Sequence, residues 1–172
     1  GMAGDRVRRW SWVELLDEAE HVRLGGWSNR AVLTEAAGSV VSSPVLFGAQ
    51  VARVPEAVAV SCAGQSVTYR ELDEASNRLA HLLVGLGVGP GERVALLFSR
   101  SVEAVVSILA VLKTGAAYVP VDPAVPAARV EFVLGDAAPV VAVCASACAD
   151  RLDGFDLVVV EFDDPRVGGQ PS

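Results

Sequence analysis

Apolar residues recur every three or four positions between Tyr69 and Leu86, and charged residues occupy many of the other positions. This period predicts an amphipathic helix with one buried face. After Arg93, short apolar runs alternate with segments of helical period. Strands that alternate with helices form βαβ units, so we expect a parallel sheet with helices on both faces. The predicted strands are 93–98, 117–121, 140–144 and 157–162, and the predicted helices are 102–113, 127–134 and 145–152.

A small hairpin is expected before this alternating region. Residues 57–62 and 65–68 have strand character, and Ala63-Gly64 between them suits a tight turn. The predicted fold class is therefore α/β, a helix-covered and mostly parallel sheet with a small N-terminal hairpin.

The front of the chain is expected to be a helix followed by a linker. Ser11 and Glu14 can form a capping box, and apolar residues then recur at helical spacing until Gly25-Gly26 is expected to end the helix. Residues 27–42 show no sustained period, which indicates a linker.

A second short helix is expected to follow this linker. Ser43 can cap it, Pro44 suits the first helical position, and Pro55 marks its end. This interpretation divides the chain into an N-terminal helix and linker (1–43), a folded region (44–167) and a frayed tail (168–172).

Composition and charge narrow the classes of partner. The net charge is −7 at neutral pH, whereas nucleic acids and anionic membranes need a surface of lysine and arginine, so neither is expected as a partner. The longest apolar stretch, Val102 to Leu112, falls well short of the roughly 20 residues that span a bilayer. No secretory leader is recognisable, so a cytoplasmic protein is expected.

Candidate groups for chemistry are few. Cys62, Cys144 and Cys148 cannot all pair, and no nearby histidine or further cysteine pair completes a zinc site, so reduced buried thiols are expected. His21 and His81 have no serine or cysteine nucleophile beside them and are interpreted as surface or boundary residues. No catalytic, cofactor-binding or metal-binding residue is assigned.

Two segments could suggest a phosphate site, and both have a structural interpretation. The glycine cluster 87–91 follows a helix and precedes a strand, which is the reverse of a phosphate-binding loop. We expect Gly87 to end the helix and the rest to form a turn. Lys113-Thr114 lacks the preceding glycine of a P-loop, and Lys113 is expected to complement the helix dipole.

Carboxylates follow two of the predicted strands. Asp163-Asp164 could hold a metal, but Asp164-Pro165 also opens a turn, and the turn is favoured. Asp122-Pro123 is a slightly better candidate for a ligand site, because ligands bind at the carboxyl ends of parallel strands.

Two short blocks contain residues typical of helix caps and helix ends. The block 67–72 contains a capping box formed by Thr68 and Glu71. The block 112–122 joins a buried helix, through a glycine stop, to a strand that carries Pro120. Because proline cannot donate to a ladder, this strand is expected to end or bulge there.

These blocks resemble the first two core motifs of the adenylation domains of nonribosomal peptide synthetases, with mild departures at Val67, Thr114 and Val121. The resemblance covers roughly Pro44 to Phe162 and implies the first subdomain of the domain's large lobe, in which the motif residues have scaffold roles. These residues are Thr68, Tyr69, Glu71, Leu72, Leu112, Lys113, Gly115, Ala117, Tyr118, Val119, Pro120 and Asp122.

The resemblance implies a parent enzyme that uses ATP and Mg²⁺ to convert an amino acid into an aminoacyl adenylate and then loads it on the phosphopantetheine of a carrier domain. The stretch before Pro44 resembles the linker from a condensation domain. The implied partners are the remainder of the adenylation domain and the adjacent condensation and carrier domains. No segment after Asp122 resembles the family's phosphate-binding loop, so this segment alone is expected to be inactive and to hold no cofactor.

Two alternative functions and one further partner stay open. A free-standing flavodoxin-like module would bind a small ligand at the strand ends, where Ser99 and Ser101 precede a helix, although Ser101 is also a simple N-cap. An acyl- or aryl-acid ligase of the same superfamily is the other alternative. A parallel sheet without its neighbouring strands leaves an open edge or apolar face, so a homodimer or strand exchange is predicted.

Overall fold

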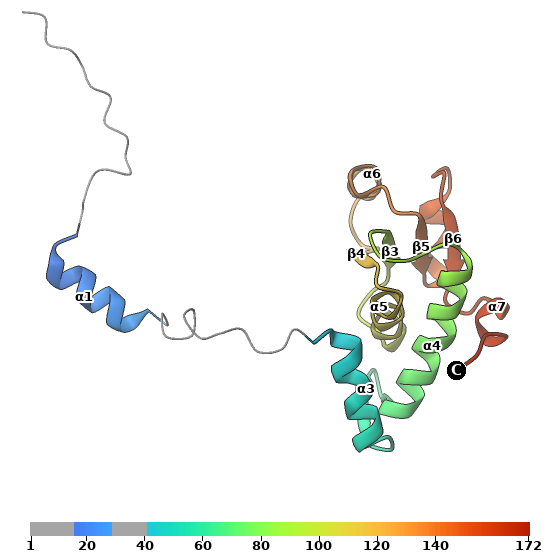
Figure 1. Cartoon of the computed structure of the whole chain (residues 1–172). Coiled ribbons are helices and arrows are strands. Elements are labelled where there is room, and N and C mark those ends of the chain that lie inside the picture. The colour runs from blue at the N-terminus through green and yellow to red at the C-terminus, as the bar shows by residue number, and fades with distance from the viewer. Residues whose placement is uncertain (1–15, 29–40) are drawn as a thin grey trace, which may run out of the picture. The chain divides into compact units, whose positions relative to one another are not determined.

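The computed structural model describes residues 16–28 and 41–172 of the chain. Contacts between Cα atoms divide the chain into two compact units, one ending at Val40 and the other starting at Val41. Each unit is described by itself (Figure 1).

The described part of the first unit contains helix α1 (Glu18–Trp27). Its capping box is formed by Asp17 and Glu20, each of which accepts a hydrogen bond from the backbone N–H of the other. The prediction that Gly25-Gly26 ends this helix is wrong, because the helix continues to Trp27. The capping box predicted at Ser11 and most of the predicted linker lie outside the described residues.

The second unit holds the two sheets and the remaining described helices. Its helices are α3 (Ser43–Arg53), α4 (Tyr69–Gly85), α5 (Val102–Thr114), α6 (Ala127–Ala137) and α7 (Pro165–Gly168), with a 3₁₀ helix η2 (Ser146–Leu152). Its strands are β1 (Val58–Cys62), β2 (Gln65–Thr68), β3 (Arg93–Leu97), β4 (Ala117–Val121), β5 (Val141–Cys144) and β6 (Val158–Glu161).

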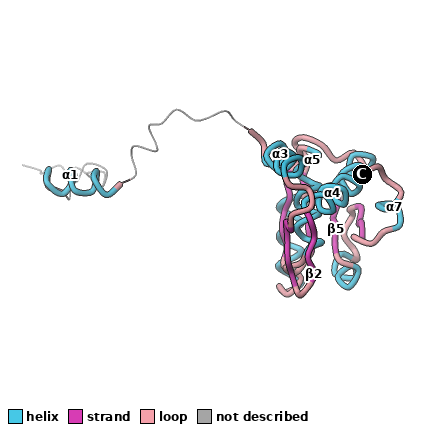
Figure 2. Tube along the Cα trace, turned by 90° about the horizontal axis from the view of Figure 1, so that it is seen from below, coloured by secondary structure: helices cyan, strands magenta, loops and turns pink. Residues whose placement is uncertain are grey.

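The predicted hairpin is confirmed. Strands β1 and β2 pair antiparallel, with Cys62 opposite Gln65, and they form a two-stranded ribbon separate from the larger sheet (Figure 2). Ala63 and Gly64 both have positive φ, 50° and 82°, which is the backbone of the hairpin turn that matches the twist of the flanking strands.

The predicted capping box at the start of α4 is also confirmed. The Glu71 backbone N–H donates to Thr68 Oγ1 at 3.2 Å, and the Thr68 N–H donates to Glu71 Oε2 at 2.8 Å. The Thr68 hydroxyl also donates to Glu71 Oε2 at 2.9 Å, and the bonds that the Thr68 backbone and hydroxyl donate lower the pKa of Glu71. The capping therefore stabilises the fold above the carboxyl's unfolded pKa and is lost as the pH falls through its lower folded pKa.

Gly87 ends α4, as predicted. Its φ of 90° lets its N–H donate to the Val84 carbonyl at 2.9 Å, and the Val88 N–H donates to the Leu83 carbonyl at 3.0 Å. These two bonds form a Schellman motif, which a glycine favours because the left-handed backbone is strained for other residues.

The larger sheet is entirely parallel and has the strand order β4-β3-β5-β6. Helices cover both of its faces, as predicted, with α4 and α5 on one side and α6 on the other (Figure 1). The α4/α5 face buries residues such as Leu83, Val94 and Val143, and the α6 face buries residues such as Leu97 and Leu134.

Strand β4 does not end or bulge at Pro120, so that prediction is wrong. Pro120 is paired with Leu96 in register, and the strand continues to Val121. The Ala117 N–H donates to the Glu92 carbonyl at 2.9 Å, toward β3, so by alternation the nitrogen of Pro120 points away from β3. An edge strand tolerates proline at such a position because no ladder bond is lost.

The capping box gives the first test. Thr68→Ala should lower the free energy of unfolding by about 1 kcal/mol, because one N–H at the start of α4 loses its side-chain acceptor. Ser42→Ala is the matched control, since Ser42 occupies the same position before α3 but makes no capping bond through its side chain. Urea denaturation of both variants measures the difference, and equal losses would contradict the assigned cap.

Candidate functional site

Lys113, near the end of α5, joins α5 to α4 through a cluster of short polar contacts. Its Nζ donates to Asp73 Oδ1 at 2.7 Å, to Ser76 Oγ at 2.7 Å and to Asn77 Oδ1 at 2.6 Å, and lies 3.2 Å from the Asp73 carbonyl oxygen. The side chain of Lys113 is 14% exposed and that of Asp73 is 29% exposed. Removing one partner of such a partly buried, hydrogen-bonded ion pair destabilises the fold, because the charge of the other partner is left without compensation.

An ammonium group fits this cluster better than a guanidinium would. It has three protons, and the three side-chain acceptors on one turn of α4 receive them. The planar, forked guanidinium of arginine is larger and directs its donors differently. Lys113 is the only lysine among the 14 lysine and arginine residues of the chain. The ordinary expectation that lysine is a solvated surface residue does not apply here.

The same lysine reaches a third helix. Its Nζ lies 5.5 Å from the centre of the Phe47 ring of α3, a cation–π distance. The Phe47 ring also lies 5.9 Å from the ring of Tyr69, the first residue of α4. Lys113 and Tyr69 come from the two different sequence blocks, and α3 contacts both.

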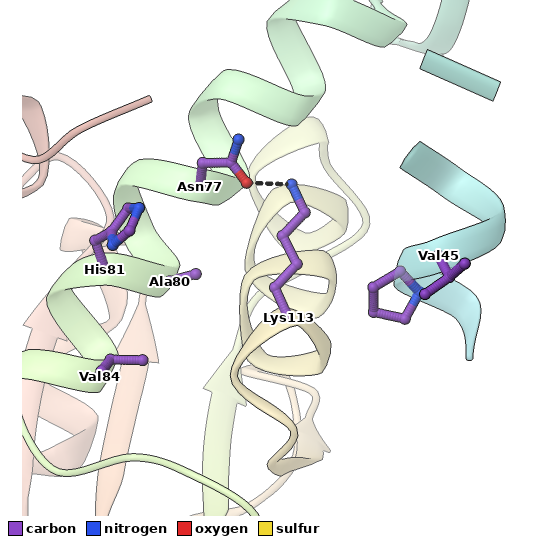
Figure 3. Close-up of a pocket in the computed structure, with 7 residues that line it drawn as sticks. Val45, Asn77, Ala80, His81, Val84 and Lys113 are labelled. Atoms are coloured by element: carbon purple, nitrogen blue, oxygen red, sulfur yellow. Dashed lines mark hydrogen bonds between the residues drawn. The ribbon is translucent and has the colours of Figure 1, made fainter. Parts of the chain in front are cut away.

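A cavity of about 400 Å³ lies beside this cluster. Figure 3 shows residues of its lining, with Asn77 and Lys113 joined by their hydrogen bond, Ala80, His81 and Val84 farther along α4, and Val45 on α3. The lining is mostly apolar, and its one cation is already bound by the acceptors of α4. The cavity therefore offers no unpaired cation, and His81 is the one side chain in its lining that could act as a nucleophile or base.

The prediction that Lys113 serves the dipole of its own helix is incomplete. Lys113 is in the last turn of α5, but its charge is paired with Asp73 of α4. This pairing was not predicted, because Asp73 is 40 residues away along the chain. The signal that could have indicated a special role is that Lys113 is the one lysine among the 14 lysine and arginine residues.

A second, open groove lies at the carboxyl ends of β3 and β4. It has a volume of about 740 Å³ and includes Ser99, Arg100 and Asp122 in its lining. Asp122 Oδ1 accepts from the Ala124 N–H at 2.8 Å, which closes the turn after β4. The Ser101 hydroxyl accepts from the Ala104 N–H at 3.2 Å, so Ser101 is the N-cap of α5.

The other residues of the second block build the connection from α5 to β4. Gly115 has φ of 81°, and a Cβ there would lie 3.1 Å from Cγ of Pro90, so both the backbone angle and the space favour glycine. Along β4, Ala117, Tyr118 and Pro120 are exposed, Val119 is partly buried and Val121 is buried. Leu112 precedes Lys113 in α5, and Leu72 of the first block is buried in α4.

The two carboxylates after β6 have contacts within the fold. Asp164 caps the short helix α7, which the sequence analysis took for a turn, and also pairs with Arg166. Hydrogen bonds from the Arg166 side chain and backbone lower the pKa of Asp164. Asp163 accepts a hydrogen bond from the Ser146 hydroxyl. No group of three or more metal-binding side chains occurs within residues 16–28 and 41–172.

The thiols and histidines are also accounted for. Cys144 is buried, as predicted, whereas Cys62 and Cys148 are only partly buried. His81 on α4 and His21 on α1 are exposed. No helix within the described ranges is long and apolar enough to cross a membrane.

This parallel sheet, its hairpin and its capped helices define a class of protein. The sequence pattern of the AMP-binding enzyme family matches residues 47–168, and the chain belongs to that family. Within it, the chain corresponds to the N-terminal part of the adenylation domain of nonribosomal peptide synthetases.

Relatives in sequence are peptide synthetases. An isonitrile lipopeptide synthase of Mycobacterium tuberculosis is 58% identical over 157 residues, which are 91% of this chain and 6% of that protein. This alignment is longer than the stretch from Pro44 to Ser172, so it includes residues before Pro44. A dimodular nonribosomal peptide synthase of Bacillus subtilis is 43% identical over 125 residues, 73% of this chain and 5% of that protein.

Solved structures agree with this placement. The peptide synthetase FmoA3 (S1046A), bound to α-methyl-L-serine-AMP, matches with a TM-score of 0.72 and 31% identity over 78% of this chain and 16% of that one. The N-terminal subdomain of Klebsiella oxytoca NpsA matches with a TM-score of 0.69 and 27% identity, over 78% of this chain and 35% of that one. The chain thus spans a small part of its relatives.

The lysine cluster gives a second test. Lys113→Met should lower the free energy of unfolding by roughly 2 to 3 kcal/mol, because Asp73 and its neighbours lose a charged donor in a partly buried place. Lys113→Arg should recover only part of this loss. Arg129→Met is the control, because Arg129 is exposed and lies 5.3 Å from the Phe132 ring, so its cation–π contact is worth less than about 1 kcal/mol. Equal effects of Lys113→Met and Arg129→Met would refute the assignment.

The buried thiol gives a third test. Burial, with the nearby charge of Glu161 as a smaller cause, raises the pKa of Cys144 to about 11. Since the thiolate is the reactive form, Cys144 should react with iodoacetamide at pH 8 far more slowly than Cys62 and Cys148. Peptide mass spectrometry measures the order of labelling, and in denaturant the three rates should become similar. Early labelling of Cys144 in the folded protein would contradict its burial.

Proposed function

We propose that this chain is the N-terminal, structural part of an enzyme that activates an amino acid with ATP and Mg²⁺, forming an aminoacyl adenylate and pyrophosphate. The aminoacyl group then passes to the phosphopantetheine of a carrier domain. The observation that carries the proposal is the match to an adenylation domain holding an aminoacyl-AMP, FmoA3, at a TM-score of 0.72. The proposed place of work is the cytoplasm, where ATP is available.

The proposed role of this segment within the enzyme is scaffolding. The side chains of the two sequence blocks make a helix cap, a glycine stop, an edge strand and an ion pair between helices. All of these features involve residues of this chain alone and support its own helices and strands. On this proposal residues 44–167 form the first part of the adenylation domain, residues 1–43 connect it to a condensation domain, and residues 168–172 are a tail.

The substrate class has two candidates, and a specific observation favours each. The FmoA3 complex contains an α-methyl-L-serine adenylate, which favours an amino acid. Klebsiella oxytoca NpsA was solved with 3-hydroxybenzoyl-AMSN and with 3-hydroxyanthranilyl-AMSN, which favours an aryl acid. The amino acid is preferred because the match to FmoA3 has the higher sequence identity, 31% against 26–28%.

Pyrophosphate exchange tests this proposal. The chain alone should show no acid-dependent ATP–pyrophosphate exchange, because nothing after Asp122 resembles a phosphate-binding loop. A longer protein, extended along the native gene through the whole adenylation domain, should exchange with one or a few amino acids. The same panel should include aryl and fatty acids.

The possible outcomes separate the alternatives. Exchange with an aryl or fatty acid by the longer protein would replace the amino acid as substrate. Exchange by the short chain would overturn its scaffold role. If no acid supports exchange in a folded longer protein, the adenylation proposal itself fails.

A further inference from the structure

The two edges of the parallel sheet differ in what they offer another strand. On β4 the outward positions are Tyr118 and Pro120, because Ala117 bonds to β3 and successive residues alternate. Pro120 has no N–H, so this edge lacks a donor near its centre. Proline on an edge strand is one of the devices that block pairing with another chain.

The outer edge of β6 contains no proline, so it keeps all of its N–H donors. The Phe162 N–H donates to the Cys144 carbonyl at 2.9 Å, toward β5, so the N–H groups of Val159 and Glu161 point outward by alternation. In the part of the chain that the structure describes, neither outward N–H has a hydrogen-bond partner. The strand and the residue before it read Leu157-Val158-Val159-Val160-Glu161, without proline or lysine.

The side chains on this edge are also suited to pairing. Val158 on one face of the sheet is 44% exposed. Leu157 and Val159 on the other face pack only partly against the core. Two backbone groups of this edge are already bonded, since the Leu157 N–H donates to the Phe155 carbonyl and the Glu161 carbonyl accepts from the Asp164 N–H, both at 3.0 Å. A β-branched apolar strand whose outward N–H groups are free is still the kind of edge to which another strand is added.

We propose that the outer edge of β6 is a strand-pairing surface and that in this chain its occupant is β6 of a second copy, antiparallel about a two-fold axis. With Val159 on the axis, the two Val159 residues exchange their backbone hydrogen bonds. The Glu161 N–H of each copy donates to the Leu157 carbonyl of the other. The two sheets then become continuous across the interface.

Charge is compatible with this register. Each copy carries −7, so the two copies repel each other at long range. With Val159 on the axis, however, Glu161 of one copy lies opposite Leu157 of the other. The two Glu161 residues are then separated by roughly 14 Å along the strands, beyond the screening length of about 10 Å at 0.1 M salt. Added salt should therefore favour the dimer.

Similar structures are longer than this chain. With 77–78% of its residues the chain covers 33–35% of the NpsA N-terminal subdomain structures that it matches, so those structures contain more than twice as much chain. That additional chain is available to cover an edge in a longer protein. In the 172-residue chain, a second β6 is the occupant that is always present.

Light scattering after size-exclusion chromatography tests the proposal on the 172-residue chain over a range of concentrations. The chain should shift from monomer to dimer as concentration rises. Val159→Pro removes an outward donor and should leave a monomer, while Tyr118→Pro, at the corresponding outward position of β4, should still dimerise. Circular dichroism establishes that both variants are folded.

A charge variant covers the case in which Val159→Pro does not fold. Val158→Lys places a cation beside the edge and should weaken dimerisation at least tenfold. Val140→Lys is its control, because Val140 has a similar exposure of 39%, receives the same charge and precedes the inner strand β5. Loss of the dimer in Val140→Lys but not in Val158→Lys would overturn the proposal.

Amide hydrogen exchange provides an independent measurement on the unmodified chain. At low concentration the N–H groups of Val159 and Glu161 should exchange quickly, while those of Val158 and Val160, which face β5, are protected. At high concentration Val159 and Glu161 should become protected as well. A chain that stays monomeric at every concentration, or a dimer that leaves these two amides unprotected, would refute the assigned edge.

Discussion

The ammonium group of Lys113 is the contact that holds the helical layer of this fold together. It binds three side chains on α4 and lies over an aromatic ring of α3, so three helices meet at one nitrogen. The end of α5 is thereby fixed. Because only Gly115 and Ala116 separate α5 from β4, the position of the first edge strand follows from the same contact.

The regular elements were predictable because their signals are local. Strands 65–68 and 117–121 have the predicted bounds, and α4 ends one residue before the predicted limit. In these segments the burial period, the caps and the glycine stops all agree. The family could be recognised for the same reason, since the two blocks are short and contiguous.

The features that were missed depend on distant parts of the chain. The partners of Lys113 lie 36 to 40 residues earlier, and no period in the sequence connects them. The tolerance of β4 for Pro120 depends on which side of the strand has a neighbour, which is known only from the strand order. The helix that continues through Gly25-Gly26 to Trp27 shows that a glycine pair does not by itself end a helix. In α7, Pro165 follows the cap Asp164 and begins a helix, where a turn had been predicted.

The guarded edge of β4 also bears on how the sheet is assembled during protein synthesis. Strand β3 leaves the ribosome first, β4 pairs on one side of it, and Pro120 closes that side to further strands. Every later strand, β5 and then β6, is added on the opposite side. Among the described strands, the sheet is therefore extended on one side only after β4, since β5 pairs with β3 and β6 pairs with β5.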